Sequence, residues 1–493
     1  MNHSVHQTIL IALKVWAKRK VSGTSLRCAR RYYSQMSIAA GLGPEGAGIL
    51  GDICGREAAA FGINWAFAPV SDIDLNFRNP ITNTRTYGSD PEMVRNCVVD
   101  YIRRCQAHGV AATAKHFPGD GCDERDQHLV TTINDLSVED WDRTYGMIYR
   151  SAIEADVLTI MTGHIMQPAW SKKLNPTLKD EDIKPASLSR ELLSGLLRDR
   201  LGFNGLIVTD ATTMAGFNCV MPRESAVPAS IAAGADMFLF TKNLEEDFAY
   251  MKKGIRDGIV SKERLDEAVT RILATKAALR LFGKSNIPDL EAGLKLIEED
   301  SELDILKRNA EASITLVKDK QDVFPIVPSK YPRILYYPID NGSGQIALYG
   351  SDVSATDAFR TKLEKQGFHV DIFEPTPGIE GLSASSEEIK KGYDLIIYCV
   401  NIATKSNQTT VRIEWQEPMG ANVPSYCHTV PTVFISRENP YHLLDVPRVK
   451  TYINTYQSDD MVLDVLIEKL MGKSEFRGKS PVDAFCGKWD TRL

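Results

Sequence analysis

The chain has 493 residues, of which 43% are apolar and 25% charged, and a formal net charge of −6. This length is past the size at which one hydrophobic core stops growing, so we expect at least two domains. The ordinary composition excludes a disordered or fibrous protein, and the modest negative charge gives no reason to expect nucleic acid or an anionic membrane as partner of the main body.

The first 34 residues form an atypical basic segment. No acidic residue precedes Glu45, whereas lysines and arginines crowd the stretch from Lys14 to Arg31. Apolar residues recur at helical spacing from Val5 to Trp16, which fits either an amphipathic targeting helix or a solvated helix. The apolar run is too short for a signal peptide or a membrane span, so we expect a cytoplasmic protein without a membrane-spanning helix.

Nine cysteines are scattered without any C-x-x-C pair. An odd number at irregular spacing favours reduced thiols in a cytoplasm and argues against a disulfide framework or a zinc site. We therefore expect no metal.

Residues 35–285 alternate short apolar runs with amphipathic helices, the rhythm of a parallel sheet covered by helices. The expected strands are 63–70, 110–117, 157–164, 206–211 and 236–240. Several end in polar residues, and barrel enzymes keep their chemistry at the carboxyl ends of strands. We interpret this region as a TIM-like catalytic domain.

Residues 286–330 are expected to be a helical linker with helices at 290–299 and 303–313. A second α/β rhythm follows at 331–493, and we interpret it as a smaller C-terminal α/β sandwich domain with an open sheet. Its expected strands are 333–337, 369–373, 395–400, 432–436 and 451–456, and its helices 357–366 and 461–471. Nothing in this half looks catalytic, so we assign it a role as a scaffold or as the surface of a homodimer.

The most informative stretch is K-H-F-P-G-D-G at 115–121, followed by a long polar loop. Lys115 and His116 lie at the end of an expected strand, where polar residues are usually functional rather than structural. Within the loop, Asp126 and His128 are two residues apart, a spacing that lets a carboxylate hold one imidazole nitrogen while the other faces a substrate. Most such D-x-H triplets are solvated surface, so this signal is weak alone.

A second signal is Asp210, a lone carboxylate at the end of the apolar strand 206–211. A carboxylate in that place can be a nucleophile. It can also be a helix N-cap, a role that aspartate often takes.

Taken together, these motifs resemble glycoside hydrolase family 3, in particular its β-N-acetylglucosaminidase branch. The resemblance extends from about Ser37 through the barrel-like region and more loosely through 431–441. It implies Asp210 as the nucleophile, His128 as the acid/base and Asp126 as the partner of His128. It further implies that Arg85, Lys115 and His116 bind sugar hydroxyls, and it calls for no cofactor.

The implied reaction is a retaining hydrolysis through a covalent glycosyl-aspartate. The expected substrates are oligosaccharides of the cell-wall (muropeptide) or chitin type that end in β-linked N-acetylglucosamine. Phosphorolysis by the same residues is an alternative, because a histidine acid/base lacks the negative charge that would repel phosphate.

One departure from the family concerns the start of the chain. The family's first barrel strand and its Glu- and Gly-rich acidic motif have no counterpart before residue 34. We therefore expect a (β/α) TIM-like barrel that lacks its first strands. An inactive sugar-binding remnant is the corresponding alternative function.

Overall fold

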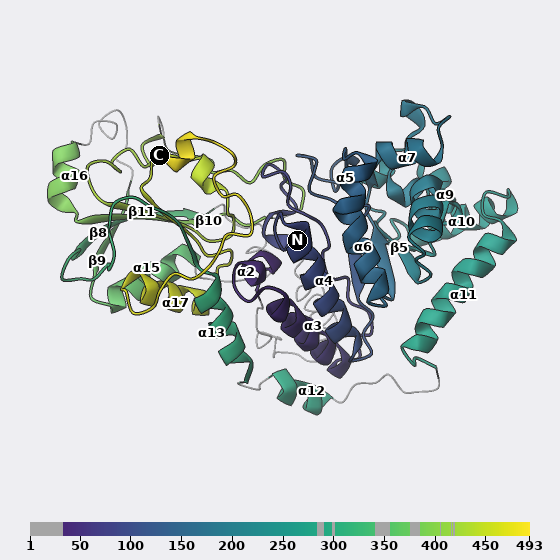
Figure 1. Cartoon of the computed structure of the whole chain (residues 1–493), viewed down its shortest axis with the longest axis horizontal. Coiled ribbons are helices and arrows are strands. Elements are labelled where there is room, and N and C mark those ends of the chain that lie inside the picture. Colours follow the sequence, from purple (N-terminus) through teal and green to yellow (C-terminus); the bar gives the residue numbers. More distant parts are fainter. Residues whose placement is uncertain are drawn as a thin grey trace.

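The computed structural model describes residues 33–282, 290–297, 301–340, 355–374, 385–404, 406–415, 417 and 420–493. Nearly all of the basic segment 1–34 lies outside these residues, and so does part of the expected helix 290–299. Two sheets with their helices form two lobes, which lie side by side in Figure 1. No helix among the described residues is both long and apolar enough to span a membrane.

The first lobe contains a parallel four-stranded sheet in the order β1-β3-β5-β6. Its strands are β1 (Thr113–Phe117), β3 (Thr159–Thr162), β5 (Leu206–Ala211) and β6 (Met237–Leu239). These strands confirm four of the five expected segments. The fifth, 63–70, runs beside β1 through parallel bridges at Trp65 and Val70. The described part of this lobe shows a parallel sheet, and a closed barrel is not seen in it.

Helices cover this sheet because their apolar stripes need a partner surface. They are α2 (Gln35–Ala40), α3 (Gly43–Ala60), α4 (Pro91–Gln106), α5 (Val138–Arg143), α6 (Tyr145–Glu154), α7 (Pro168–Leu174), α8 (Ala215–Asn218), α9 (Arg223–Ala233), α10 (Leu244–Arg256) and α11 (Lys262–Ala278). Shorter elements are η1 (Asn83–Arg85), η2 (Asp180–Asp182), η3 (Ala186–Leu188), the π-helix η4 (Glu191–Arg200) and the paired strands β2 (Thr132–Ile133) and β4 (Ile165–Met166). Close packing of α3 on α4 uses glycine: a Cβ at Gly51 would lie 2.5 Å from the carbonyl oxygen of Tyr101.

Helices α12 (Leu290–Ile297) and α13 (Ser301–Ser313) lead to the second lobe along the lower edge of Figure 1. The residues that follow differ from the expected helical linker. Thr315–Asp319 forms strand β7, which pairs antiparallel with β12 and so belongs to the second sheet. The sequence did not predict this strand because it contains the charged residues Lys318 and Asp319. In the structure Lys318 is buried, and its ammonium donates to the carbonyl of Pro447 at 3.0 Å.

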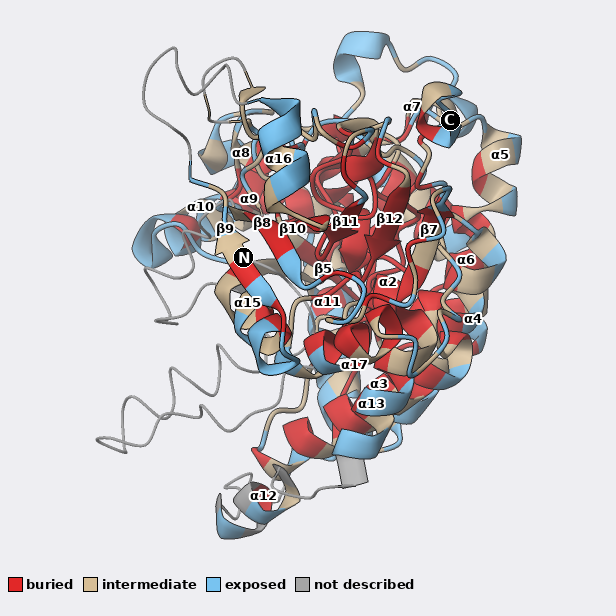
Figure 2. Cartoon of the chain, turned by 90° about the vertical axis from the view of Figure 1, so that its left-hand side faces the viewer, coloured by how far each residue is buried: buried red, intermediate tan, exposed pale blue. Residues whose placement is uncertain are grey.

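The second lobe has a six-stranded sheet in the order β7-β12-β11-β10-β8-β9, parallel except at β7. The remaining strands are β8 (Arg333–Asp340), β9 (His369–Ile372), β10 (Leu395–Asn401), β11 (Thr432–Ser436) and β12 (Thr451–Asn454). Its helical elements are α15 (Ala355–Lys365), α16 (Ser386–Gly392), α17 (Asp460–Leu470), η7 (His442–Leu444) and η8 (Asp490–Arg492). The five predicted strands of this half are confirmed, and Figure 2 shows the central ones buried.

Candidate active site

Polar side chains gather where the strands of the first sheet end. The carboxyl ends of parallel strands lie at one edge of a sheet, and the register pairs Val70 with Lys115 and Thr162 with Thr209. Asp72, His116, His164 and Asp210 follow or end neighbouring strands at this edge. All four are buried or nearly so. The edge therefore holds a cluster of ionisable groups, as the sequence predicts.

Asp210 lies within β5 with 17% of its side chain exposed. Its Oδ2 is 3.6 Å from Nε2 of His116, and its Oδ1 accepts a hydrogen bond from the amide of Ala211 at 2.7 Å. Burial raises the pKa of this carboxyl group, but electrostatic attraction to the surrounding basic side chains His116, His164, His128 and Lys115 outweighs burial and lowers it well below its usual value. Asp210 is therefore an ionised carboxylate at neutral pH.

His116 is held in place by Asp72. Oδ2 of Asp72 lies 2.8 Å from Nδ1 of the imidazole, while its Oδ1 accepts from the amides of His116 at 2.9 Å and Asp120 at 2.8 Å. Asp72 is 1% exposed, and its pKa is lowered because hydrogen bonds and the charge of His116 overcome the effect of burial. The ring is thereby fixed with its Nε2 toward Asp210.

Lys115 and Arg85 are two buried cations at the same site. Burial, followed by the charge of Arg85, lowers the pKa of Lys115 to about 8. Arg85 is 8% exposed and donates from Nη1 to the carbonyl of Ile81 at 3.0 Å, whereas its Nε and Nη2 have no hydrogen-bond partner. Buried donors of this kind are costly unless a ligand satisfies them. These two groups are therefore candidates for binding polar groups of a substrate.

Asp126 and His128 form the oriented pair that the sequence predicts. Oδ1 of Asp126 accepts from the amide of His128 at 2.8 Å and lies 2.6 Å from its Nδ1. His128 is near enough to Asp210 to lower the pKa of that carboxyl group by its charge, so the pair lies at the same site. All six residues singled out from the sequence therefore meet at one edge of the first sheet.

Several residues at the site were missed in the sequence. Asp72 was detectable, because S-D-I-D directly follows the apolar segment 63–70 just as polar residues follow the other strands. His164 also ends an expected strand, where its Nδ1 is 2.9 Å from Oγ of Ser187 and its Nε2 is 3.1 Å from the carbonyl oxygen of Ala211. Burial lowers the pKa of His164 to about 4, so it supports the backbone beside Asp210 as a neutral ring.

The loop that carries His128 is anchored through Gln127, which the sequence did not single out. The Gln127 amide nitrogen donates to Asp120 at 2.9 Å, and its oxygen accepts from the amide of His164 at 2.9 Å. Burial raises the pKa of Asp120 to about 7. The amide of Ala215 also donates to the carbonyl of His128 at 3.0 Å. These contacts tie the loop that carries His128 to the strands that bear the other site residues.

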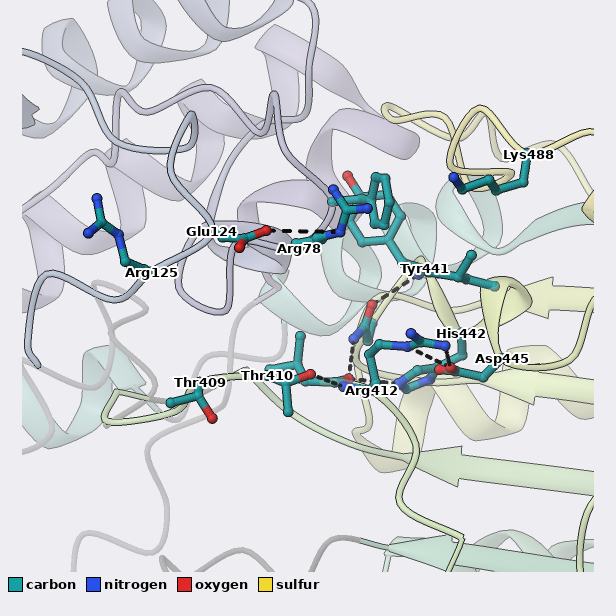
Figure 3. Close-up of a pocket in the computed structure, with 14 residues that line it drawn as sticks. Arg78, Glu124, Arg125, Thr409, Thr410, Arg412, Tyr441, His442, Asp445 and Lys488 are labelled. Carbon is teal, nitrogen blue, oxygen red and sulfur yellow. Dashed lines mark hydrogen bonds and ion pairs between the residues drawn. The ribbon is translucent and has the colours of Figure 1, made fainter. Parts of the chain in front are cut away.

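A cavity of about 440 Å³ lies at the junction of the two lobes (Figure 3). The first lobe contributes Phe77, Arg78, Glu124 and Arg125, and the second contributes residues 409–412, Asn439, Tyr441, His442, Leu444, Asp445 and Lys488. Arg125 immediately precedes Asp126, so the cavity begins beside the loop that carries Asp126 and His128. Its volume is within the range of small-molecule sites.

Comparison with known proteins identifies the family. Residues 11–275 match the glycosyl hydrolase family 3 N-terminal domain, a match that begins before residue 37, where the motif resemblance starts. Over 460 residues the chain is 55% identical to a β-N-acetylglucosaminidase/β-glucosidase of Cellulomonas fimi, covering 93% of this chain and 81% of that protein.

Two solved structures extend the comparison. The β-glucoside phosphorylase BglX superposes with a TM-score of 0.90 and 43% identity, over 99% of this chain and 89% of that one. A family 3 β-N-acetylglucosaminidase from Paenibacillus sp. FPU-7 shares the fold with a TM-score of 0.75 at 24% identity, over 97% and 90% of the two chains. The protein is thus a glycosidase that belongs to glycoside hydrolase family 3, as its motifs predict.

Proposed function

We propose that this protein cleaves terminal β-linked N-acetylglucosamine from oligosaccharides with retention of configuration. Asp210 is the nucleophile, His128 is the acid/base, and Asp126 orients His128. The observation that carries the proposal is the ionised Asp210 held among His116, His128 and Lys115, with the 2.6 Å contact between Asp126 and His128 beside it. Membership of the family is also the basis for proposing that the parallel sheet is part of a TIM-like barrel.

The reaction has two steps. Asp210 attacks the anomeric carbon, the bond from that carbon to the leaving oxygen breaks, and protonated His128 gives its proton to the leaving oxygen. Neutral His128 then takes a proton from water, which attacks the glycosyl ester and releases Asp210. Because Asp126 occupies Nδ1, Nε2 is the nitrogen that exchanges the proton.

The buried cations bind the sugar in this scheme. Nε and Nη2 of Arg85 are donors without a protein partner, and hydroxyl oxygens of a sugar would satisfy them. The charges of Arg85, Asp210 and Asp72 all influence the pKa of Lys115, so its ammonium is close enough to these groups to donate to the same ring. We assign the leaving group to the cavity at the lobe junction, because that cavity begins beside the acid/base loop.

The nature of the sugar is tested by comparing aryl β-N-acetylglucosaminides with aryl β-glucosides. The Cellulomonas fimi relative is named for both activities. We expect turnover of both classes with preference for the N-acetylated sugar. The natural substrates would be of the cell-wall (muropeptide) or chitin type.

Phosphorolysis is a second candidate, and the similarity to the phosphorylase BglX favours it. After donating its proton, His128 is neutral and does not repel phosphate as a carboxylate would. The acceptor in the second step would then be phosphate, and the product would be a sugar 1-phosphate.

One experiment tests both candidates. A 2-deoxy-2-fluoro glycoside should trap the intermediate, and peptide mapping should find the label on Asp210. Release of the trapped sugar with and without phosphate then distinguishes the free sugar from its 1-phosphate. A label on another carboxylate would refute the assignment of Asp210, and absence of turnover on every β-glycoside would favour an inactive sugar-binding protein.

A further inference from the structure

A segment of the second lobe reaches the acid/base pair. Asn407 lies in residues 406–415, which follow β10, and its backbone N–H donates to Oδ2 of Asp126 at 2.7 Å. The two residues are 281 positions apart in the chain. The other oxygen of Asp126 serves His128, through contacts of 2.8 Å to the amide and 2.6 Å to Nδ1. Each carboxylate oxygen of Asp126 thus has its own partner.

The backbone of Asn407 has a left-handed conformation, with φ of +66°. Few residues other than glycine adopt this conformation, and asparagine is one of those that tolerate it. An L-residue with a branched Cβ would be strained there. The residue type is therefore matched to the turn that directs this N–H toward Asp126.

Further contacts fix the position of the second lobe against the first. The Tyr441 hydroxyl donates to Asp74 at 2.5 Å, and the Asn83 amide donates to Asn439 at 3.2 Å. Both contacts are buried, and Tyr441 also lines the cavity at the junction of the lobes (Figure 3). The donor on Asn407 is therefore held by a fixed lobe.

We propose that Asn407 is a positioning residue whose backbone N–H fixes Asp126, so that the second lobe completes the acid/base pair of the first. Asp126 is only 2% exposed, and a buried carboxylate oxygen without its donor loses a charge-assisted hydrogen bond. The carboxylate would then reorient or admit water, and His128 would lose its fixed orientation.

The protonation state of Asp126 agrees with this role. Burial raises the pKa of Asp126, but the hydrogen bonds and charge of His128, followed by the N–H of Asn407, lower it below its usual value. An ionised Asp126 accepts from Nδ1 and so selects one tautomer of His128. Loss of acid/base function is therefore the expected consequence of removing the donor, and this consequence rests on the proposed role of His128.

The test compares Asn407→Pro with Asn407→Gly in the full chain. Proline removes the N–H and fixes φ near −65°, whereas glycine keeps the N–H and adopts positive φ readily. For a glycoside with a poor leaving group we expect Asn407→Pro to lower kcat about 10- to 100-fold, as loss of a supporting hydrogen bond does at other sites. Asn407→Gly should retain most of the wild-type kcat on the same glycoside. An activated aryl glycoside should be turned over at nearly the wild-type rate by both variants.

A further variant and a double mutant distinguish a specific loss of acid/base function from a general loss of folding. Asn407→Val keeps the N–H but disfavours the left-handed turn, so it should show a smaller loss with the same dependence on the leaving group. In a His128→Ala background Asn407→Pro should add little, because residues that act as one unit are not additive.

Equal losses for good and poor leaving groups, or equal losses in the glycine and proline variants, would overturn the proposal. If His128→Ala itself showed no dependence on the leaving group, the proposed function would fail instead. The two failures are therefore distinguishable.

Discussion

Two carboxylates of the same sheet have opposite environments. Asp236 precedes β6 at the amino-terminal edge, and Asp210 lies near the carboxyl-terminal edge in β5. Asp236 forms an ion pair with Arg198 at 2.6 Å, a short ion pair with Arg264 and a third with Arg271 at 3.5 Å, and it also accepts from the amide of Ile207 at 2.9 Å. Among the described residues, the ion-pair contact of Asp210 is longer, 3.6 Å to Nε2 of His116, an imidazole whose pKa burial lowers.

The difference separates a structural site from a reactive one. At the amino-terminal edge, both carboxylate oxygens of Asp236 accept from donors of the protein at hydrogen-bonding distance. At the carboxyl-terminal edge, the nearby Arg85 keeps donors without partners, and in the described part of the chain the ion-pair contact of Asp210, to His116, is 3.6 Å long. Such an arrangement is preorganised for a ligand's charge and hydroxyl groups.

The largest expected effect is a loss of activity on replacing Asp210, which replacing Asp236 should not cause. Asp210→Ala should lower kcat/KM about 10⁴-fold or more, because no neighbouring group can form the covalent intermediate. Its urea midpoint should shift less than that of Asp236→Ala, because the nearest ion-pair contact of Asp210 is long. Steady-state kinetics and unfolding curves of both variants check the contrast, which a small activity loss in Asp210→Ala would contradict.

His128→Ala is expected to have the next largest effect. Kcat on substrates with poor leaving groups should fall about 10²- to 10⁴-fold, the usual range for a general acid. Activated aryl glycosides, which need little protonation, should be slowed far less. A plot of log kcat against the pKa of the leaving phenol measures this, and parallel lines for the wild type and the variant would show that His128 only binds substrate.

Asp236→Ala should have the opposite effect to Asp210→Ala: a large loss of stability with little loss of activity. It leaves the partly buried cations Arg198, Arg264 and Arg271 without the buried carboxylate that they share, and breaking such a network costs about 3–5 kcal/mol of the free energy of unfolding. The folded fraction should keep kcat/KM within about twofold. Urea unfolding and kinetics normalised to folded protein provide the measurement, with Asp236→Asn as the control that keeps the shape of the side chain.

The sequence predicted the strands and the reactive edge because both follow local patterns. Apolar runs of strand length ending in Thr, His or Asp locate β1, β3 and β5, and the spacing of Asp126 and His128 lies within one loop. Strand β7 escaped prediction because its charged residues break the alternation, and its pairing with β12 spans a long stretch of chain.

Contacts between segments that are distant in the chain leave no pattern in the sequence from which they could be predicted. Asn407 meets Asp126 from the other lobe, and the residue before β6 gathers arginines from η4 and α11. Neither spacing nor composition encodes such encounters, since they depend on how complete elements pack. The expectation that the second half contributes nothing near the chemistry therefore differs from the structure at Asn407.

The smallest expected effect concerns pH and Lys115, for which stability and binding should move in opposite directions. The pKa of Lys115 is about 8 in the folded protein and 10.5 as the ordinary value. Between these values the unfolded chain binds more protons, so this group makes the free energy of unfolding rise with pH from 8 toward 10.5. Below pH 8 both states are charged, and the destabilisation from the buried ammonium, on the order of 3 kcal/mol, is fully present. Over the same interval Lys115 loses the charge that binds sugar hydroxyls, so KM should rise with pH. Lys115→Met should flatten both trends, whereas the exposed control Lys320→Met should leave them unchanged. If Lys115→Met kept the wild-type rise in stability between pH 8 and 10, another group would have to be its source.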